Sequence, residues 1–176
     1  MARELGHPPD WEAVQTALVQ AYAEAWECDV EDVRLPAETV SVTVTREGRD
    51  GTEVLLLRRR PERGGFWQSV TGRREPQETP AVAAAREVAE ETGRALPVRS
   101  LHYRHAFALG EASPPLLAQE DAFAATWEGN AEVRLGPEHA DFAWLKVPEA
   151  LQRLPYPGLR RAVERATTSP QSPVWR

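Results

Sequence analysis

The residues best suited to chemistry are gathered in one stretch, GRREPQETPAVAAAREVAEETG, which spans residues 72–93. Of the charged residues between its two terminal glycines, one arginine and four acids attract attention by their spacing: Arg86, Glu78, Glu87, Glu90 and Glu91. Acids this close together repel one another unless a cation lies among them. Carboxylate oxygens are the ligands that Mg²⁺ prefers, and Mg²⁺ usually accompanies phosphates. The stretch therefore predicts a magnesium site for a phosphorylated ligand.

The acids must be positioned by a helix. Thr79 can accept a hydrogen bond at the helix start, Pro80 suits the first helical position, and Gly93 is a natural stop, so a helix is predicted over residues 80–92. A helical wheel places four residues on one narrow stripe, predicted to be buried: Ala81, Ala85, Val88 and Thr92. The acids Glu87, Glu90 and Glu91 fall on a neighbouring arc.

Helix energetics do not explain these acids. Glu87 and Glu91 are one turn apart and repel, and Glu90 and Glu91 sit where the helix dipole favours cations. A bound divalent cation would explain them. The alternative is a solvated acidic face, with Arg86 and Arg94 as partners for Glu90.

Other patterns predict a sheet around this helix. Residues 38–46 alternate apolar and polar side chains and form a predicted hairpin with residues 52–58. Further strands are predicted over 66–71, 98–109, 121–128 and 141–147, with a loop over 111–120. Helices are predicted from Pro148 through EALQRL and over 157–166. The expected fold class is α/β or α+β, a mixed sheet with helices packed on it.

The domain boundaries are predicted from the same patterns. Residues 1–37 form a helical extension, with a helix over 10–27; residues 38–166 form the main domain, and 167–176 a flexible tail. An aromatic stripe on the N-terminal helix packs against the domain or against a second subunit, which would make a homodimer.

Composition limits the partners and the location. The chain has 176 residues and a net charge of −6, which argues against nucleic acid as a partner. Its single cysteine, Cys28, allows no internal disulfide framework, so a cytoplasmic protein is expected. No apolar run is long enough for a membrane helix.

The acidic stretch resembles the signature of the Nudix hydrolases. That signature is Gly, five residues, Glu, seven residues, then Arg-Glu-apolar-any-Glu-Glu-any-Gly-apolar. Eight positions match in register: Gly72, Glu78, Arg86, Glu87, Val88, Glu90, Glu91 and Gly93. The final apolar position is Arg94 instead, and the loop carries Pro76-Gln77 where the family often has a glycine. The resemblance implies a Nudix-type fold, a mixed sheet sandwiched between helices, here with an extra N-terminal helix.

The resemblance also implies an activity. Nudix enzymes hydrolyse phosphoanhydrides with Mg²⁺, and Mn²⁺ is a possible substitute. The flanks FWQSVTG and FAWLKVPEAL look most like the bacterial dihydroneopterin triphosphate pyrophosphatase branch, which also acts on nucleoside triphosphates. The expected partner is therefore a small nucleotide-like substrate, with dihydroneopterin triphosphate or (deoxy)nucleoside triphosphates ahead of dinucleoside polyphosphates, nucleotide sugars and CoA.

The resemblance assigns roles to the acidic stretch. Glu87, Glu90 and Glu91 would bind the metal, with a backbone carbonyl of Thr71 or Gly72, and one of the acids would also act as the base. Arg86 and Glu78 would pair and hold the loop against the helix, the alternative for Glu78 being simple loop solvation. Gly93 would support the helix end.

Residues outside the stretch complete the expected site. Glu138 is the candidate for a further catalytic acid from a later loop, ahead of Glu120 and Asp121, and His139 is either a base or a polar loop residue. Basic residues that could reach substrate phosphates, or form a solvated loop, are Arg58, Arg59, Arg60 and Arg63. Aromatic residues that could stack on a ring, or pack in the core, are Trp67, Phe66 and Phe107.

Two other classes of protein remain open from sequence. One is a Nudix-like module that binds a nucleotide or a protein without turnover; such modules typically lose a box acid, and none is lost here. The other is an unrelated acidic scaffold, which would bind no divalent cation.

Overall fold

The computed structural model describes residues 37–109, 116–129 and 131–168, together with Ala17 and Ala21, which are helical. The predicted N-terminal helix and its aromatic stripe lie otherwise outside the described residues, as does most of the predicted tail. The fold below belongs to the second of the two units of the chain, Leu35–Arg176.

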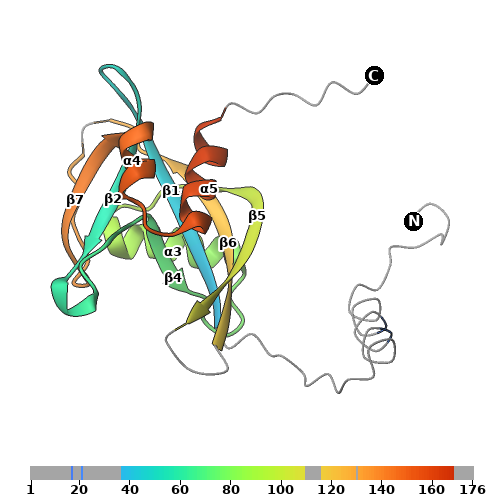
Figure 1. Cartoon of the computed structure of the whole chain (residues 1–176). Coiled ribbons are helices and arrows are strands. Elements are labelled where there is room, and N and C mark those ends of the chain that lie inside the picture. Colours follow the sequence, from blue (N-terminus) through green and yellow to red (C-terminus); the bar gives the residue numbers. More distant parts are fainter. Residues whose placement is uncertain (1–16, 18–20, 22–36, 110–115, 130, 169–176) are drawn as a thin grey trace, which may run out of the picture. The chain divides into compact units, whose positions relative to one another are not determined.

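A mixed, seven-stranded sheet forms the centre of this unit (Figure 1). Its strands are β1 (Ala37–Gly48), β2 (Gly51–Arg59), β3 (Trp67–Gln68), β4 (Val70–Arg73), β5 (Val98–Leu109), β6 (Leu116–Thr126) and β7 (His139–Lys146). The order is β3-β2-β1-β6-β5, with β4 paired to β1 and β7 to β2. Only the β1–β6 pairing is parallel among the described strand pairs.

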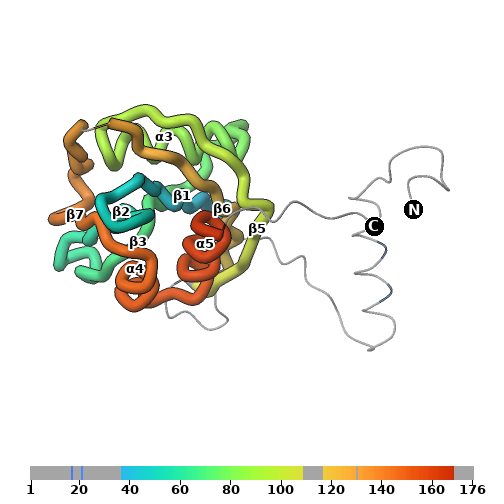
Figure 2. The backbone as a smooth tube through the Cα atoms, turned by 90° about the horizontal axis from the view of Figure 1, so that it is seen from above, coloured from blue at the N-terminus to red at the C-terminus, as the bar shows by residue number. Residues whose placement is uncertain are grey.

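Helices cover both faces of the sheet. They are α3 (Pro80–Thr92), α4 (Val147–Arg153) and α5 (Pro157–Thr167), preceded by the short 3-10 helix η1 (Pro61–Arg63). Figure 2 shows α3 on one face and α4 and α5 on the other. The predicted fold class, a mixed sheet sandwiched between helices, is confirmed.

Alternation along β1 separates two layers of core. Val40, Val42 and Val44 pack with Val88 of α3, whereas Ser41 and Thr43 alternate with them and face the other way. On the far side, residues of β2, β7, α4, α5 and the connection between the two helices form a second cluster that includes Leu56, Leu145, Leu154, Leu159 and Val163.

Three predicted strand boundaries are wrong. The 66–71 stretch divides into β3 and β4, because Trp67–Gln68 pairs with β2 whereas Val70–Arg73 pairs with β1. Strand β6 begins at Leu116, inside the predicted loop, because it continues antiparallel to β5 as far as the Leu109–Leu116 pair. Strand β7 runs over His139–Lys146 rather than 141–147, since Val147 already begins α4.

The buried face of α3 also differs from the prediction. Its bounds, Pro80–Thr92, are as predicted, but its buried residues are Ala83, Ala84, Glu87, Val88, Glu91 and Thr92. Ala81 is exposed and Ala85 only half-buried. The prediction assumes that only small and apolar residues face the sheet, whereas Glu87 and Glu91 also lie on the buried side of the helix. Two acids are therefore held where a solvated acidic face would not place them.

Candidate active site

The carboxyl group of Glu87 lies directly against the backbone of β4. Glu87 is 9% exposed, and a Cβ atom on Gly72 would overlap its carboxyl group. Glycine is therefore required at residue 72 by space and not by backbone conformation. Because Gly72 has only a hydrogen atom in place of a side chain, the carboxyl group of Glu87 can approach β4, the strand that carries the Thr71 and Gly72 carbonyl groups.

Arg86 ties the preceding loop to the helix. Its Nε and Nη2 atoms donate to the two carboxylate oxygens of Glu78 at 2.9 and 3.0 Å. Its Nη2 also donates to the carbonyl of Arg73 at 2.9 Å, and its Nη1 to Glu87 Oε1 at 2.7 Å. Because this paired geometry orients a guanidinium strongly, Arg86 fixes the position of Glu87. Glu78 is not a merely solvated loop residue.

Glu91 lies deeper than Glu87, at 7% exposure. Its Oε2 accepts from the backbone N–H of Thr71 at 3.3 Å, and its Oε1 lies 3.9 Å from His139 Nε2. The same His139 nitrogen is 3.3 Å from Gln68 Nε2, which donates to the Thr71 hydroxyl at 2.9 Å. Strands β3, β4 and β7 thus meet around the carboxyl group of Glu91.

The surroundings of the two buried acids compensate their charge incompletely, since Arg86 pairs with Glu87 whereas Glu91 has no such partner among the described residues. Burial, reinforced by the neighbouring charge of Glu87, raises the pKa of Glu91 to about 9. Burial also raises the pKa of Glu87, although Arg86 opposes the shift. The hydrogen bonds from Arg86 instead lower the pKa of Glu78 to about 2. A cation beside Glu87 and Glu91 would favour their ionised forms.

Glu90 completes the acidic group but is held more loosely. Its side chain is 59% exposed and accepts from Arg86 Nη1 at 3.2 Å. Within the described part of the chain, no three acidic, histidine or cysteine side chains already stand close enough to enclose a metal ion. The donors nevertheless suit Mg²⁺, which takes few protein carboxylates and keeps several waters. The chemistry of Glu87, Glu91, the exposed Glu90 and the adjacent β4 carbonyl groups fits such an ion.

All three acids line one open cleft of about 1030 Å³. Arg59 and Arg63 lie on its wall with Glu138, whose carboxylate they approach at 3.3 and 3.0 Å. A cleft that combines acids with nearby guanidinium groups can hold an anionic ligand through a cation and through Arg at the same time.

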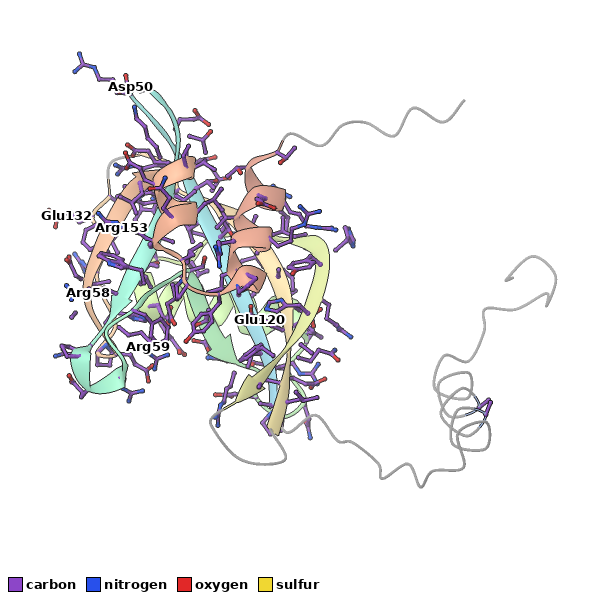
Figure 3. All side chains as sticks on the ribbon, viewed as in Figure 1. Asp50, Arg58, Arg59, Glu120, Glu132 and Arg153 are labelled. Carbon is purple, nitrogen blue, oxygen red and sulfur yellow. The ribbon has the colours of Figure 1, made fainter. Side chains whose placement is uncertain are left out.

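Three residues predicted to bind substrate lie elsewhere. Arg58 is exposed and donates to the Gly65 carbonyl at 3.3 Å, Arg60 donates to the Pro137 carbonyl at 2.6 Å, and Trp67 lies beneath Arg153. None of the three lines the cleft. Arg58 and Arg59 are consecutive residues of β2 at an irregularity in its pairing with β7, and only Arg59 lines the cleft; Figure 3 shows Arg58 at the outer edge of the sheet.

Other predicted candidates do line the cleft. These are Phe66, Phe107, Glu120, Glu138 and His139, whereas Asp121 does not and instead pairs with Arg104 at 2.8 Å. Sequence reasoning missed Gln68, His105 and Tyr156, which are also lining residues. They come from β3, β5 and the start of α5, and no local spacing relates them to the acidic stretch.

The two departures from the signature have structural explanations. Arg94, in the apolar position, places its guanidinium 5.0 Å above the ring of Trp127 and donates to the Glu128 carbonyl at 2.6 Å. It covers an aromatic surface as an apolar residue would. Gln77 adopts a φ of 69°, a left-handed conformation that glycine adopts at lower cost.

A family model described as the NUDIX domain matches residues 35–166. The chain belongs to the Nudix hydrolase family. The predicted family resemblance is thereby confirmed. Within the described residues, no helix is long and apolar enough to cross a membrane.

Solved structures support the same fold. The dihydroneopterin triphosphate pyrophosphohydrolase of E. coli has a TM-score of 0.65 and 26% identity, covering 76% of this chain and 97% of that one. A MutT protein from Methanosarcina mazei Go1 has a TM-score of 0.57 and 27% identity, covering 73% and 91%. The Nudix domain of Shewanella oneidensis NrtR, solved with ADP ribose, has a TM-score of 0.62 at 19% identity, covering 83% and 95%, and shares the fold.

A curated relative from Myxococcus xanthus carries the name octanoyltransferase. It is 50% identical over 167 residues, which make up 95% of this chain but 47% of the relative. The chain thus spans about half the length of the curated relative it matches.

Proposed function

We propose that this Nudix protein is a Mg²⁺-dependent pyrophosphohydrolase that cleaves a phosphoanhydride of a nucleoside triphosphate or of dihydroneopterin triphosphate. One observation carries the proposal: Glu87 and Glu91 are buried together at the wall of a large cleft, with no positive charge that fully compensates them. The solved E. coli dihydroneopterin triphosphate pyrophosphohydrolase, at 26% identity, supports the substrate class.

Each residue of the site has a proposed role. Glu87, Glu90 and Glu91 hold the cation with the carbonyl of Gly72 or Thr71. When bound, Mg²⁺ offsets the charge of the polyphosphate and lowers the pKa of water. Mn²⁺ would serve the same role. Arg86 and Glu78 keep Glu87 in place, as residues behind metal ligands commonly do.

The remaining residues of the cleft bind the substrate and manage protons. Of the four arginines predicted to reach the phosphates, Arg59 and Arg63 contact them, because Arg58 and Arg60 do not line the cleft. Glu138, which both guanidinium groups already approach, stays the candidate for the additional catalytic acid, with His139 beside it. Burial and the charge of Arg59 lower the pKa of His139, so its ring is neutral and able to accept a proton at neutral pH.

The proposed partner is a small molecule. The net charge of −6 disfavours nucleic acid, and a cytoplasmic location suits nucleotide substrates. A homodimer remains an expectation that rests on the N-terminal segment outside the described residues.

A substrate panel tests the proposal. Purified protein is incubated with dihydroneopterin triphosphate, nucleoside triphosphates, dinucleoside polyphosphates, nucleotide sugars and CoA, with Mg²⁺, with Mn²⁺ or with EDTA, and products are identified by mass. We expect cleavage of a triphosphate that requires the metal. Binding without turnover across the panel would instead indicate a non-catalytic module, and equal turnover in EDTA would contradict the metal requirement.

A further inference from the structure

A second buried acid lies in the cleft, on a different element from the acids of α3. Glu120 of β6 has a side chain only 5% exposed and lines the cleft. Its Oε1 atom has no hydrogen-bond partner within the described part of the chain. Figure 3 shows Glu120 beside β6, below α5. Since an unpaired buried acceptor is costly, this oxygen indicates a group that arrives with the ligand.

His105 faces Glu120 without satisfying it. The two residues are directly paired across β5 and β6, and His105 Nε2 lies 3.5 Å from Glu120 Oε1. The ring is held between Tyr103 and Phe107, with centroids 5.4 and 5.9 Å away, and a Cβ atom on Gly158 would overlap it. Burial lowers the pKa of His105, so the ring is neutral near pH 7 and does not compensate the acid.

The strand register places Glu120 at a distance from the part of the cleft proposed to bind the phosphates, which lies beside Glu87 and Glu91. Thr39 of β1 pairs with Glu120 on one side and with Arg73 of β4 on the other. Two strand spacings, about 10 Å in all, therefore separate the backbone at Glu120 from the β4 backbone beside Gly72. One extended ligand can contact both ends of the cleft.

The carboxylate of Glu120 limits which chemical groups can bind next to it in the cleft. A carboxylate repels phosphate and accepts hydrogen bonds, so it suits an uncharged group with N–H donors. Two adjacent donors, a ring N–H next to an exocyclic amino group, match a carboxylate best. Adenine lacks this pair, because its corresponding ring nitrogen is an acceptor. Tyr156 and Phe107, which also line the cleft, provide faces for a flat ring.

We propose that Glu120 determines specificity by recognising a 2-amino-4-oxopyrimidine ring, the unit that guanine and dihydroneopterin share. The inference rests on the proposed function, because it assigns the far end of the same substrate. It adds the chemistry by which the ring is chosen.

The test compares triphosphates whose rings differ in the ring N–H and the adjacent amino group. GTP and dihydroneopterin triphosphate carry both donors, ITP lacks the amino group, and ATP lacks the donor pair. For the wild type, we expect kcat/KM for GTP, for dihydroneopterin triphosphate or for both to exceed that for ITP by about 10-fold or more, with ATP also poor. The better of the two favoured compounds identifies which ring system the site takes.

The variant Glu120→Gln removes one acceptor oxygen with little change of shape. We expect kcat/KM for the favoured substrate to fall about 10- to 100-fold, to the level of ITP, while the value for ITP changes less than about threefold. Retained ITP turnover shows that the variant is folded. The matched control is Asp121→Asn, at the next position of β6, outside the cleft and paired with Arg104; it should leave the substrate order unchanged.

The outcomes separate this inference from the proposed function. Metal-dependent turnover with equal kcat/KM for GTP, dihydroneopterin triphosphate, ITP and ATP would overturn the role of Glu120 and leave the hydrolase proposal standing. A uniform loss for all substrates in Glu120→Gln would also overturn it. Absence of turnover for every compound would contradict the proposed function itself.

Discussion

At the residue scale, the site depends on the absence of a side chain at Gly72. The carboxyl group of Glu87 occupies the space that a Cβ atom would need. The glycine of the signature therefore has a packing reason at this position, and the same contact brings the acid next to the backbone carbonyls proposed as ligands.

The substitution Gly72→Ala tests this contact. The methyl group would displace the carboxyl group of Glu87 and weaken its bond with Arg86, so we expect kcat to fall by at least about 100-fold, as a small misplacement can cause. Steady-state hydrolysis, with circular dichroism to verify folding, measures the effect. A folded Gly72→Ala protein with wild-type turnover would show that the position of Glu87 does not matter.

At the element scale, helix α3 was largely predictable because its signals are local. Thr79 accepts from the Val82 N–H at 3.3 Å, Pro80 begins the helix, and Gly93 ends it with a φ of 74°. Its buried face was mispredicted, because α3 buries two acids rather than only small and apolar residues. The orientation of a helix is set by what it packs on, which a single helical wheel does not contain.

Loss of the helix cap should be measurable on its own. Thr79→Ala removes the acceptor for the Val82 N–H and should lower the free energy of unfolding by about 1 kcal/mol. Thr79→Ser keeps the hydroxyl group and serves as the control, and urea titration compares the three proteins. Equal losses for Ala and Ser would mean that the cap contributes no stability.

The left-handed residue before the helix gives a second stability prediction. Gln77 has a φ of 69°, which costs a residue with a side chain about 1 kcal/mol relative to glycine. Gln77→Gly should therefore raise the free energy of unfolding, by up to about 0.5 kcal/mol once the greater entropy of the unfolded glycine chain is subtracted. Gln77→Ala should give no gain. A lower stability for the glycine variant, by the same urea titration, would contradict the argument.

At the scale of the whole molecule, contacts between elements that are distant in the sequence bring site residues together, and local sequence patterns do not reveal such contacts. The acidic stretch, its helix and the hairpin follow from local patterns. The meeting of Glu120 with His105 depends on the register between β5 and β6, and that of Glu91 with His139 on the contact between α3 and β7, which are far apart in the sequence. Which of the neighbours Arg58 and Arg59 lines the cleft depends on how β2 is placed among the other strands.

Stability of the metal-free protein should depend on pH through Glu91. Its pKa is raised from 4.5 to about 9 by burial, so between these values the folded state binds a proton that the unfolded state has released. The free energy of unfolding therefore falls as pH rises through this range. Burial also raises the pKa of Glu120, to about 7, and that of Glu87, so the contribution of Glu91 between pH 7 and 9 is obtained by comparing the wild type with Glu91→Gln.

Urea titrations in EDTA at pH 7, 8 and 9 measure this dependence. Glu91→Gln should show a smaller fall in the free energy of unfolding than the wild type, and Glu149→Gln, an exposed residue of α4, should behave like the wild type. Identical slopes for Glu91→Gln and the wild type would mean that Glu91 is not held protonated by its surroundings.

The most direct test of the central claim is the turnover of Glu91→Gln at saturating Mg²⁺ on the best triphosphate of the panel. If the buried acids of α3 hold the cation for phosphoanhydride cleavage, kcat falls by about two orders of magnitude or more, while the fold is kept and Glu149→Gln stays near the wild type. A folded Glu91→Gln protein with wild-type kcat would contradict the proposed site.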